Sequence, residues 1–220
     1  MILKEIDITE STDKFLKAGI AAEKQMAFYL RRKFDETKGI FVFNDLKIRR
    51  GEETAQIDHL IVHKHGMIII ESKSVTGQVQ INAQGEWVRS YGRNHSGMPS
   101  PVLQARRQGA VLRSLLQDNA KNLRGKALLG LMQAGFKSCP IQILVAISDQ
   151  GIIKRGKQKI PELLKADQIA DEADGIISRH RKGGSLIGKK DGDWGMYVFK
   201  PVEQQAVAKF LLDWHTMSSR

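Results

Sequence analysis

The chain has 220 residues and a mass of 24.7 kDa, which is long enough for one domain with a sizeable core. Its 35 Lys and Arg against 24 Asp and Glu give a net charge of +11, which favours a polyanionic partner. A single cysteine excludes an internal disulfide and a cysteine-based zinc site, and no apolar run approaches the ~20 residues that span a bilayer.

The chain begins with an acidic stretch that lacks the pattern of a signal peptide, so we expect a cytoplasmic protein without a membrane partner. Residues 12–34 follow, with apolar side chains at helical spacing, and Ser11 or Thr12 is placed to cap the predicted helix. Glu23 lies toward the packed side of this helix. It either pairs with a nearby Arg or Lys or is a carboxylate delivered to a functional site.

The next elements are strands. Residues 40–43 predict a short strand, and residues 49–53 read as a polar loop. Two longer strands then surround a turn near residues 64–66 and form a β-hairpin. If residues 64–65 are a two-residue turn, counting outward places Asp58 opposite Glu71.

The same count places Gln56 opposite Lys73, and strand alternation puts all four side chains on one face of the hairpin. A turn one residue later shifts the pairing but keeps this face. By contrast, His59 and His63 alternate onto the opposite face, which argues against a histidine metal site.

Two carboxylates directly opposite each other destabilise a sheet, so their placement calls for a balancing charge. Asp58 and Glu71 offer the oxygen ligands that suit magnesium or manganese. Lys73 would then position or deprotonate a metal-bound water, or offset charge that develops on a phosphate. The alternative interpretation is an ordinary amphipathic hairpin with a solvated acidic patch.

The remaining elements alternate between strands and helices. We predict strands at 78–81 and 87–89, a loop at 91–101, a helix at 102–119 that starts at Ser100 or Pro101, a central strand at 141–148, one or two helices at 161–179, and a terminal helix at 202–214. This order predicts an α/β fold with a mixed sheet between helices.

Several basic residues are candidates for contacts with nucleic acid, and they are spread along the chain. They are Arg49, Arg50, Arg93, Arg106 and Arg107. Tyr91 and Trp87 stand close to two arginines and are candidates for stacking on bases, although packing is the more ordinary role for Trp87.

Taken together, these motifs resemble the nuclease-related domain (NERD) of the PD-(D/E)XK nuclease superfamily, from about Gly19 to Gly135. The resemblance is carried by Gly19-Ile20-Ala21-Ala22-Glu23, Phe43-Asn44-Asp45-Leu46, Gln56-Ile57-Asp58, Ile70-Glu71-Ser72-Lys73, Gly77, Trp87 and Pro101-Val102-Leu103-Gln104. The chain departs from the family pattern at Ser100, where members usually carry Asn before the proline.

The resemblance implies a restriction-endonuclease-like α/β/α sandwich around a mixed four-stranded core. It places this core at about residues 15–150 of a single 1–220 domain, with a C-terminal elaboration at about 151–220. It further implies that Asp58, Glu71 and Glu23 hold Mg²⁺ or Mn²⁺, that Lys73 orients a water, and that Gln104 bonds to a water, a phosphate oxygen or the site backbone. Gln56 lies beside this set.

The function that we expect is therefore metal-dependent hydrolysis of phosphodiester bonds in DNA, with RNA not excluded as a substrate. A second hypothesis is a nucleic-acid-binding or regulatory module that keeps the fold and cleaves little. A third is an adaptor that recognises an acidic protein, which would lack the steep salt dependence of phosphate contacts.

Overall fold

A computed structural model describes residues 1–7, 12–127, 132–156, 159–183 and 197–218 of the chain. In chain order, its helices and strands are β1 (Ile2–Lys4), α1 (Lys14–Phe34), β2 (Ile40–Arg50), β3 (Glu53–His63), β4 (Gly66–Lys73), β5 (Gln78–Ile81), β6 (Trp87–Tyr91), β7 (Asn94–Met98), α2 (Pro101–Asp118), α3 (Ala120–Leu123), β8 (Lys126–Ala127), β9 (Met132–Gln133), β10 (Ile141–Ile147), β11 (Ile152–Lys154), β12 (Leu163–Lys165), α4 (Ala166–Gly183) and α5 (Pro201–Ser218).

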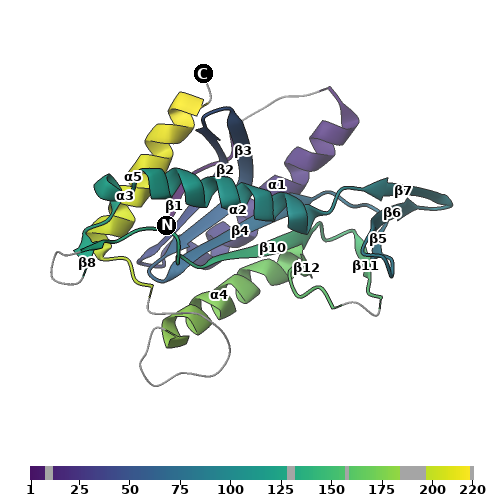
Figure 1. Ribbon diagram of the computed structural model, residues 1–220. Coiled ribbons are helices and arrows are strands. Elements are labelled where there is room, and N and C mark those ends of the chain that lie inside the picture. The colour runs from purple at the N-terminus through teal and green to yellow at the C-terminus, as the bar shows by residue number, and fades with distance from the viewer. Residues whose placement is uncertain (8–11, 128–131, 157–158, 184–196, 219–220) are drawn as a thin grey trace.

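The main sheet has six strands in the order β1-β2-β3-β4-β10-β12 (Figure 1). β2, β3 and β4 are antiparallel to one another, whereas β1, β10 and β12 pair in parallel with their neighbours. The sheet is therefore mixed, as the sequence predicts, and larger than the four-stranded core that the resemblance implies. β10 is an inner strand, which agrees with its nearly continuous apolar sequence.

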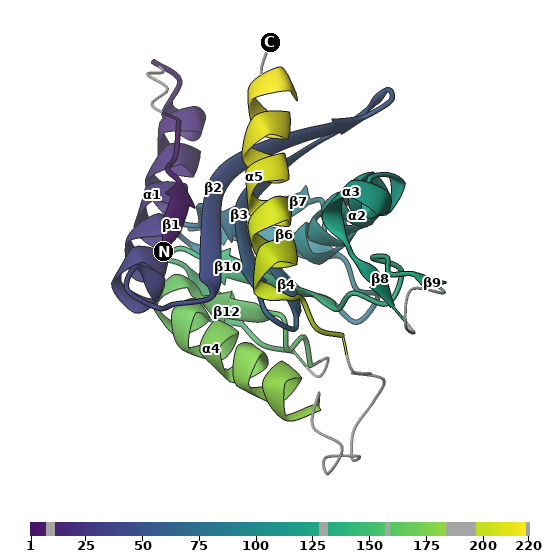
Figure 2. The ribbon, with the colours of Figure 1, turned by 90° about the vertical axis from the view of Figure 1, so that its left-hand side faces the viewer.

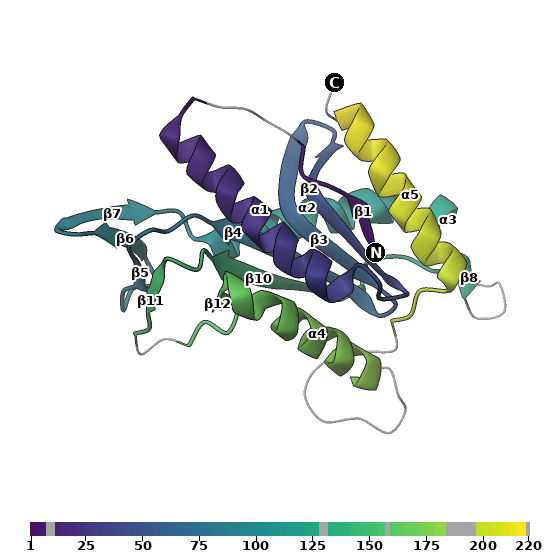
Figure 3. The ribbon, with the colours of Figure 1, turned by 180° about the vertical axis from the view of Figure 1, so that it is seen from behind.

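Helices cover both faces of this sheet. α1 and α4 lie on one face, where Met26 and Ile169 join a buried cluster with Ile61 of β3 (Figure 3). α2 and α5 lie on the other, where Leu112 and Leu211 share a second cluster with strand residues (Figure 2). The result is an α/β/α sandwich, and the burial of apolar side chains on both faces is its main stabilising contribution.

The predicted hairpin register is confirmed. β3 and β4 are joined by a two-residue turn, and His63 pairs with Gly66. Alternation along the strands then separates the two faces: Leu60 and Ile69 pack in the cluster beneath α2 and α5, whereas Ile61 packs beneath α1 and α4. Asp58 and Glu71 continue the first of these rows.

A smaller sheet, in the order β11-β5-β6-β7, extends from one side of the sandwich (Figures 1 and 3). Its base is buried, because Trp87 and Val79 pack with Val102 from the first turn of α2. Gly77 permits the close approach of β5 and β6, since a Cβ at this position would lie 2.0 Å from the carbonyl oxygen of Ser90. This sheet is thus attached to the helix that carries Gln104.

Three predicted elements are wrong in their extent. The short strand at 40–43 continues to residue 50 as β2, because residues 44–50 also pair with β3 and bury Leu46 and Ile48. The predicted loop at 91–101 contains β7, which pairs antiparallel with β6. The predicted helical stretch at 161–179 begins instead with β12, which extends the main sheet before α4 starts.

The predicted N-cap of the first helix is also corrected. Asp13 caps α1, because its Oδ1 accepts hydrogen bonds from the backbone N–H groups of Phe15 and Leu16, each at 2.8 Å. Ser11 lies outside the described residues. Ser100 caps α2 as expected. Among the residues that the structure describes, no helix combines the length and the apolar character needed to cross a bilayer.

Candidate active site

Glu71 is the most deeply placed carboxylate of the candidate site. It lies near the end of β4 and is only 1% exposed, so the alternative of a solvated acidic patch does not hold for this residue. Lys73 Nζ lies 2.6 Å from one carboxylate oxygen, and Gln108 Nε2 donates to the other at 2.9 Å. A buried carboxylate needs such partners, because desolvation strongly disfavours an unpaired charge.

Lys73 links the strand to the following helix. Its ammonium group, which remains partly exposed, also donates to Gln104 Oε1 at 3.1 Å. Gln104 lies in the first turn of α2, whose start is fixed by the Ser100 cap. Lys73 therefore contacts both of the other family-implied residues, Glu71 and Gln104.

Asp58 lies where β3 and β4 stop pairing. The last recorded pair is His59 with Ile70, and beyond it the backbone N–H of Ser72 donates to Asp58 Oδ2 at 2.8 Å. Burial raises the pKa of Asp58 well above its ordinary value of 3.8, and the nearby charges of Glu71 and Glu23 raise it further. This carboxylate thus carries an unfavourable charge that a cation would stabilise.

Glu23 reaches the same region from α1. Its pKa is raised first by burial and then by the charges of Asp45 and Glu71, against a lowering by Lys73. Within the part of the chain that the structure describes, Glu23 forms no ion pair, so the interpretation as a boundary carboxylate paired with Arg or Lys is not observed. Its electrostatic coupling instead groups it with the other acids.

Asp45 is an acid near the site for which no role is predicted from the sequence. It is 6% exposed and has a φ of +51°, the one positive value among the described residues other than glycine. The strand register continued through this position places Asp45 opposite Asp58, and the recorded pairs skip this row. The gap coincides with this positive φ, which lies outside the β region.

Gln56 and Gln108 organise the surroundings of these acids. Gln56 Nε2 donates to Asp45 Oδ1 at 2.7 Å, and Gln56 pairs with Lys47 on β2. Pairing of β3 with β4 ends at His59, so the position of Gln56 opposite Lys73 stays a prediction. Gln108, which is not among the residues predicted from the sequence, donates to the backbone oxygen of Gln56 at 2.8 Å. The sequence pattern could have indicated this residue, because Gln108 lies one helical turn beyond Gln104 and therefore on the same face of α2.

The carboxylate and amide oxygens of the candidate site decide whether a metal ion fits between them. The described residues contain no group of three or more His, Cys, Asp or Glu already arranged to hold an ion together. The chemistry of the set nevertheless suits a hard cation, since burial and the charges of neighbouring carboxylates raise the pKa values of Asp58 and Glu23. In addition, the buried Oε1 of Gln108 has no hydrogen-bond partner in the described structure.

The histidines are used elsewhere, in agreement with the predicted alternation. His59 contacts Asn44 Oδ1 at 2.8 Å and Ser72 Oγ at 3.1 Å, while His63 stacks on His180. Burial lowers the pKa of His59 to about 3, so this ring is neutral at physiological pH.

Comparison with known proteins identifies the family. A family model, the nuclease-related domain, matches residues 18–148, which is more than half of the chain. The chain belongs to the NERD family. No curated protein and no solved structure matches it. The matched region holds all five predicted catalytic positions of this NERD chain and ends just after β10.

The arginines of the NERD chain that are predicted to contact nucleic acid fall into two groups, those in ion pairs and those outside them. Arg50, at the tip of the β2–β3 hairpin, pairs with Asp118 at 2.6 Å, and Arg106 pairs with Glu162 at 2.9 Å. Arg49, Arg93 and Arg107 are exposed and form no ion pair within the described residues. These three arginines are the better candidates for phosphate contacts.

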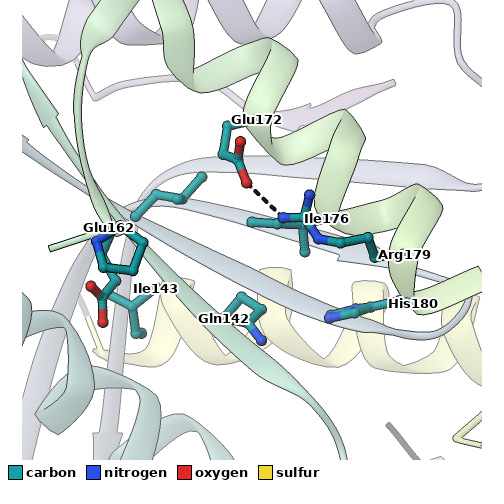
Figure 4. Close-up of a pocket in the computed structure, with 9 residues that line it drawn as sticks. Gln142, Ile143, Glu162, Glu172, Ile176, Arg179 and His180 are labelled. Carbon is teal, nitrogen blue, oxygen red and sulfur yellow. Dashed lines mark hydrogen bonds and ion pairs between the residues drawn. The ribbon is translucent and has the colours of Figure 1, made fainter. Parts of the chain in front are cut away.

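A cavity of about 240 Å³ lies away from the carboxylates, between β10 and α4 (Figure 4). Its lining includes Gln142, Glu172 and Arg179, and the last two form an ion pair at 2.6 Å. None of the residues that line it belongs to the acidic set, so we do not assign the catalytic chemistry to this cavity.

Proposed function

We propose that this NERD chain is a metal-dependent nuclease that hydrolyses phosphodiester bonds in DNA. The observation that carries the proposal is the buried contact of Glu71 with Lys73, next to an Asp58 whose pKa is raised by burial and by neighbouring charge. Clusters of titratable groups with perturbed pKa values are typical of catalytic sites. The net charge of +11 supports a nucleic-acid substrate.

The proposed cofactor is Mg²⁺ or Mn²⁺, held by Asp58 and Glu71 with Glu23 as a further ligand. When bound, such an ion polarises the scissile phosphate and lowers the pKa of a bound water. Glu71 would exchange at least part of its present bonding, because each of its oxygens accepts a hydrogen bond from the chain.

The side chains around the acids have separate roles in this proposal. Lys73 places a positive charge beside the reacting phosphate and orients the attacking water. Gln104 holds the ammonium group of Lys73 through its side-chain oxygen. Gln108 fixes the far oxygen of Glu71 and so sets the direction in which the carboxylate points.

A nucleic-acid-binding module with little cleavage is the second candidate. One observation favours it: Lys73 and Gln108 together occupy both oxygens of Glu71, so the buried carboxylate is satisfied by the chain itself. In this case the same fold would bind DNA without a metal requirement.

The cytoplasmic location and the single-domain organisation stay predictions.

Incubation of plasmid DNA, linear DNA and RNA with Mg²⁺, Mn²⁺ or EDTA separates the two candidates. We expect cleavage of DNA that requires the metal and is lost in Asp58→Ala and Lys73→Ala. Lys182→Ala and Asp213→Asn are matched controls, because both residues are exposed and distant in sequence from the acids. DNA binding without cleavage in the wild type would replace the nuclease with the binding module.

A further inference from the structure

The β6–β7 hairpin is a surface that the proposed catalysis does not use. It extends from the small sheet, beyond the edge of the main sandwich (Figures 1 and 3). Its base is firmly anchored, because Trp87 is 4% exposed and packs with Val102. Val102 stands two residues before Gln104 in α2, so the hairpin and the candidate active site share one helix turn as support.

The outer half of the hairpin is basic and aromatic. Residues 87–98 contain no Asp or Glu, and the exposed side chains include Arg89, Arg93 and His95. Tyr91 is 70% exposed at the end of β6, next to a turn in which Gly92 has a φ of +57°. The preceding acid, Glu86, lies before β6 and its carboxylate accepts a hydrogen bond from Asn82.

Alternation places Trp87, Arg89 and Tyr91 on one face of β6. The buried face at the base therefore continues outward as a guanidinium group and then a phenol ring, about 7 Å apart along the strand. Arg89 Nε donates to Ser96 Oγ of β7 at 3.1 Å, which orients the guanidinium group on this face. A cation and an open ring at this spacing suit a phosphate and its neighbouring base.

We propose that the β6–β7 hairpin binds a single-stranded segment of nucleic acid, with Tyr91 stacking on a base and Arg89 and Arg93 contacting phosphates. The inference rests on the proposed function, and it names the form of the substrate. A single strand is favoured because its bases offer unpaired faces for stacking, whereas the bases of a duplex are already stacked on one another. Because the hairpin carries basic residues and no acids, it favours an anionic partner such as the phosphate backbone over a basic or neutral partner.

Binding is tested apart from cleavage, in EDTA and on Lys73→Ala protein. The probes are fluorescently labelled oligothymidylate and a duplex of equal length, followed by fluorescence anisotropy. We expect Tyr91→Ala to weaken oligothymidylate binding by at least about five-fold, while Tyr91→Phe retains the affinity because it keeps the ring. The duplex should respond to Tyr91→Ala by less than two-fold, about the scatter of such a measurement.

The arginines are tested through salt dependence. The double variant Arg89→Ala, Arg93→Ala should reduce the slope of log affinity against log salt by about 1.4, at about 0.7 for each phosphate contact on a single strand. The matched control is Arg181→Ala, Lys182→Ala, which removes the same charge from the last turn of α4. Its slope should stay that of the parent protein.

The proposal is overturned if Tyr91→Ala binds oligothymidylate as tightly as the parent protein, or if duplex and single strand lose affinity equally. It is also overturned if neither probe binds at low salt, or if sedimentation shows that exposed β7 instead pairs two copies of the chain. Metal-dependent cleavage with binding that does not depend on the hairpin would reject this inference and leave the proposed function intact. Binding that depends on the hairpin, without cleavage, would support this inference and reject the proposed nuclease activity.

Discussion

Replacing Asp58 with asparagine should make the protein more stable in the absence of metal, while abolishing cleavage. The reason is that burial and the charge of Glu71 both penalise the ionised form of Asp58. At a cross-strand separation of about 5 Å and an effective dielectric constant of about 20, two like charges repel by about 3 kcal/mol. Asparagine removes this repulsion and nearly preserves the side-chain volume.

Two losses offset part of this gain, and one is the attraction of Lys73, whose charge lowers the pKa of Asp58. The other is a hydrogen bond. The backbone N–H of Ser72 donates to Asp58 Oδ2 at 2.8 Å, and a neutral acceptor weakens this bond by about 1 kcal/mol. The net stabilisation expected for Asp58→Asn is therefore about 1–2 kcal/mol. In a chain of this length, this corresponds to a rise of about 2–8 °C in Tm.

The effect has a definite dependence on pH. Because the folded-state pKa of Asp58 is raised, the folded protein binds more protons than the unfolded chain between the two pKa values, and stability falls as pH rises through that window. The advantage of asparagine should thus be largest above the folded-state pKa. It should shrink as pH falls through the folded-state pKa and be lost below the ordinary value of 3.8, where the aspartate is protonated in both states.

The assay is thermal unfolding by circular dichroism across this pH range, first in EDTA and then with Mn²⁺. Asp213→Asn is the matched control, because this aspartate is exposed on α5 and its substitution should leave Tm unchanged. Added Mn²⁺ should raise the Tm of the wild type and not that of Asp58→Asn. A destabilised Asp58→Asn at alkaline pH, or a gain that does not vary with pH, would refute the reasoning.

Three other outcomes test the surrounding structure. Gly77→Ala should destabilise the protein by about 3 kcal/mol or more in urea unfolding, because its Cβ would lie 2.0 Å from a backbone oxygen of β6. Gly97→Ala is the control and should be near neutral, since its Cβ meets no atom within 4 Å. Equal destabilisation by the two variants would contradict the packing of β5 on β6. Leu211→Ala should cost about 2–5 kcal/mol, since this α5 side chain is fully buried, and a cost below 1 kcal/mol would show that α5 is not part of the core. Asp45→Asn should lower the pKa of Glu23 in an NMR titration, because the Asp45 charge raises it, and an unchanged pKa would remove Asp45 from the site.

Much of the candidate site could be predicted because it depends on local rules. A two-residue turn and strict alternation suffice to place Asp58 and Glu71 on one row of the hairpin. The start of the helix that carries Gln104 could also be predicted, since a serine cap and a proline mark it. These signals operate over a few residues and do not require knowledge of the tertiary structure.

The errors arise where pairing between distant segments decides the outcome. Asn44 and Asp45 indicate the end of a strand, yet residues 44–50 pair along β3, bury Leu46 and Ile48, and bring Asp45 to the site. β7 has no apolar alternation, and its strand conformation comes from pairing with β6. β12 has only three residues and is fixed by β10. Strand propensity is weak evidence in such segments because the partner strand supplies the stabilisation.

The central claim is that the carboxylates on β3 and β4 bind a divalent cation. A crystal structure of the wild-type protein grown with Mn²⁺, with data collected at the manganese absorption edge, tests it directly. We predict one anomalous peak at about 2.0–2.3 Å from oxygens of both Asp58 and Glu71, with Lys73 displaced from Glu71 or turned toward a bound water. A peak that avoids both carboxylates, or no peak while Lys73 and Gln108 still hold Glu71, would contradict the account.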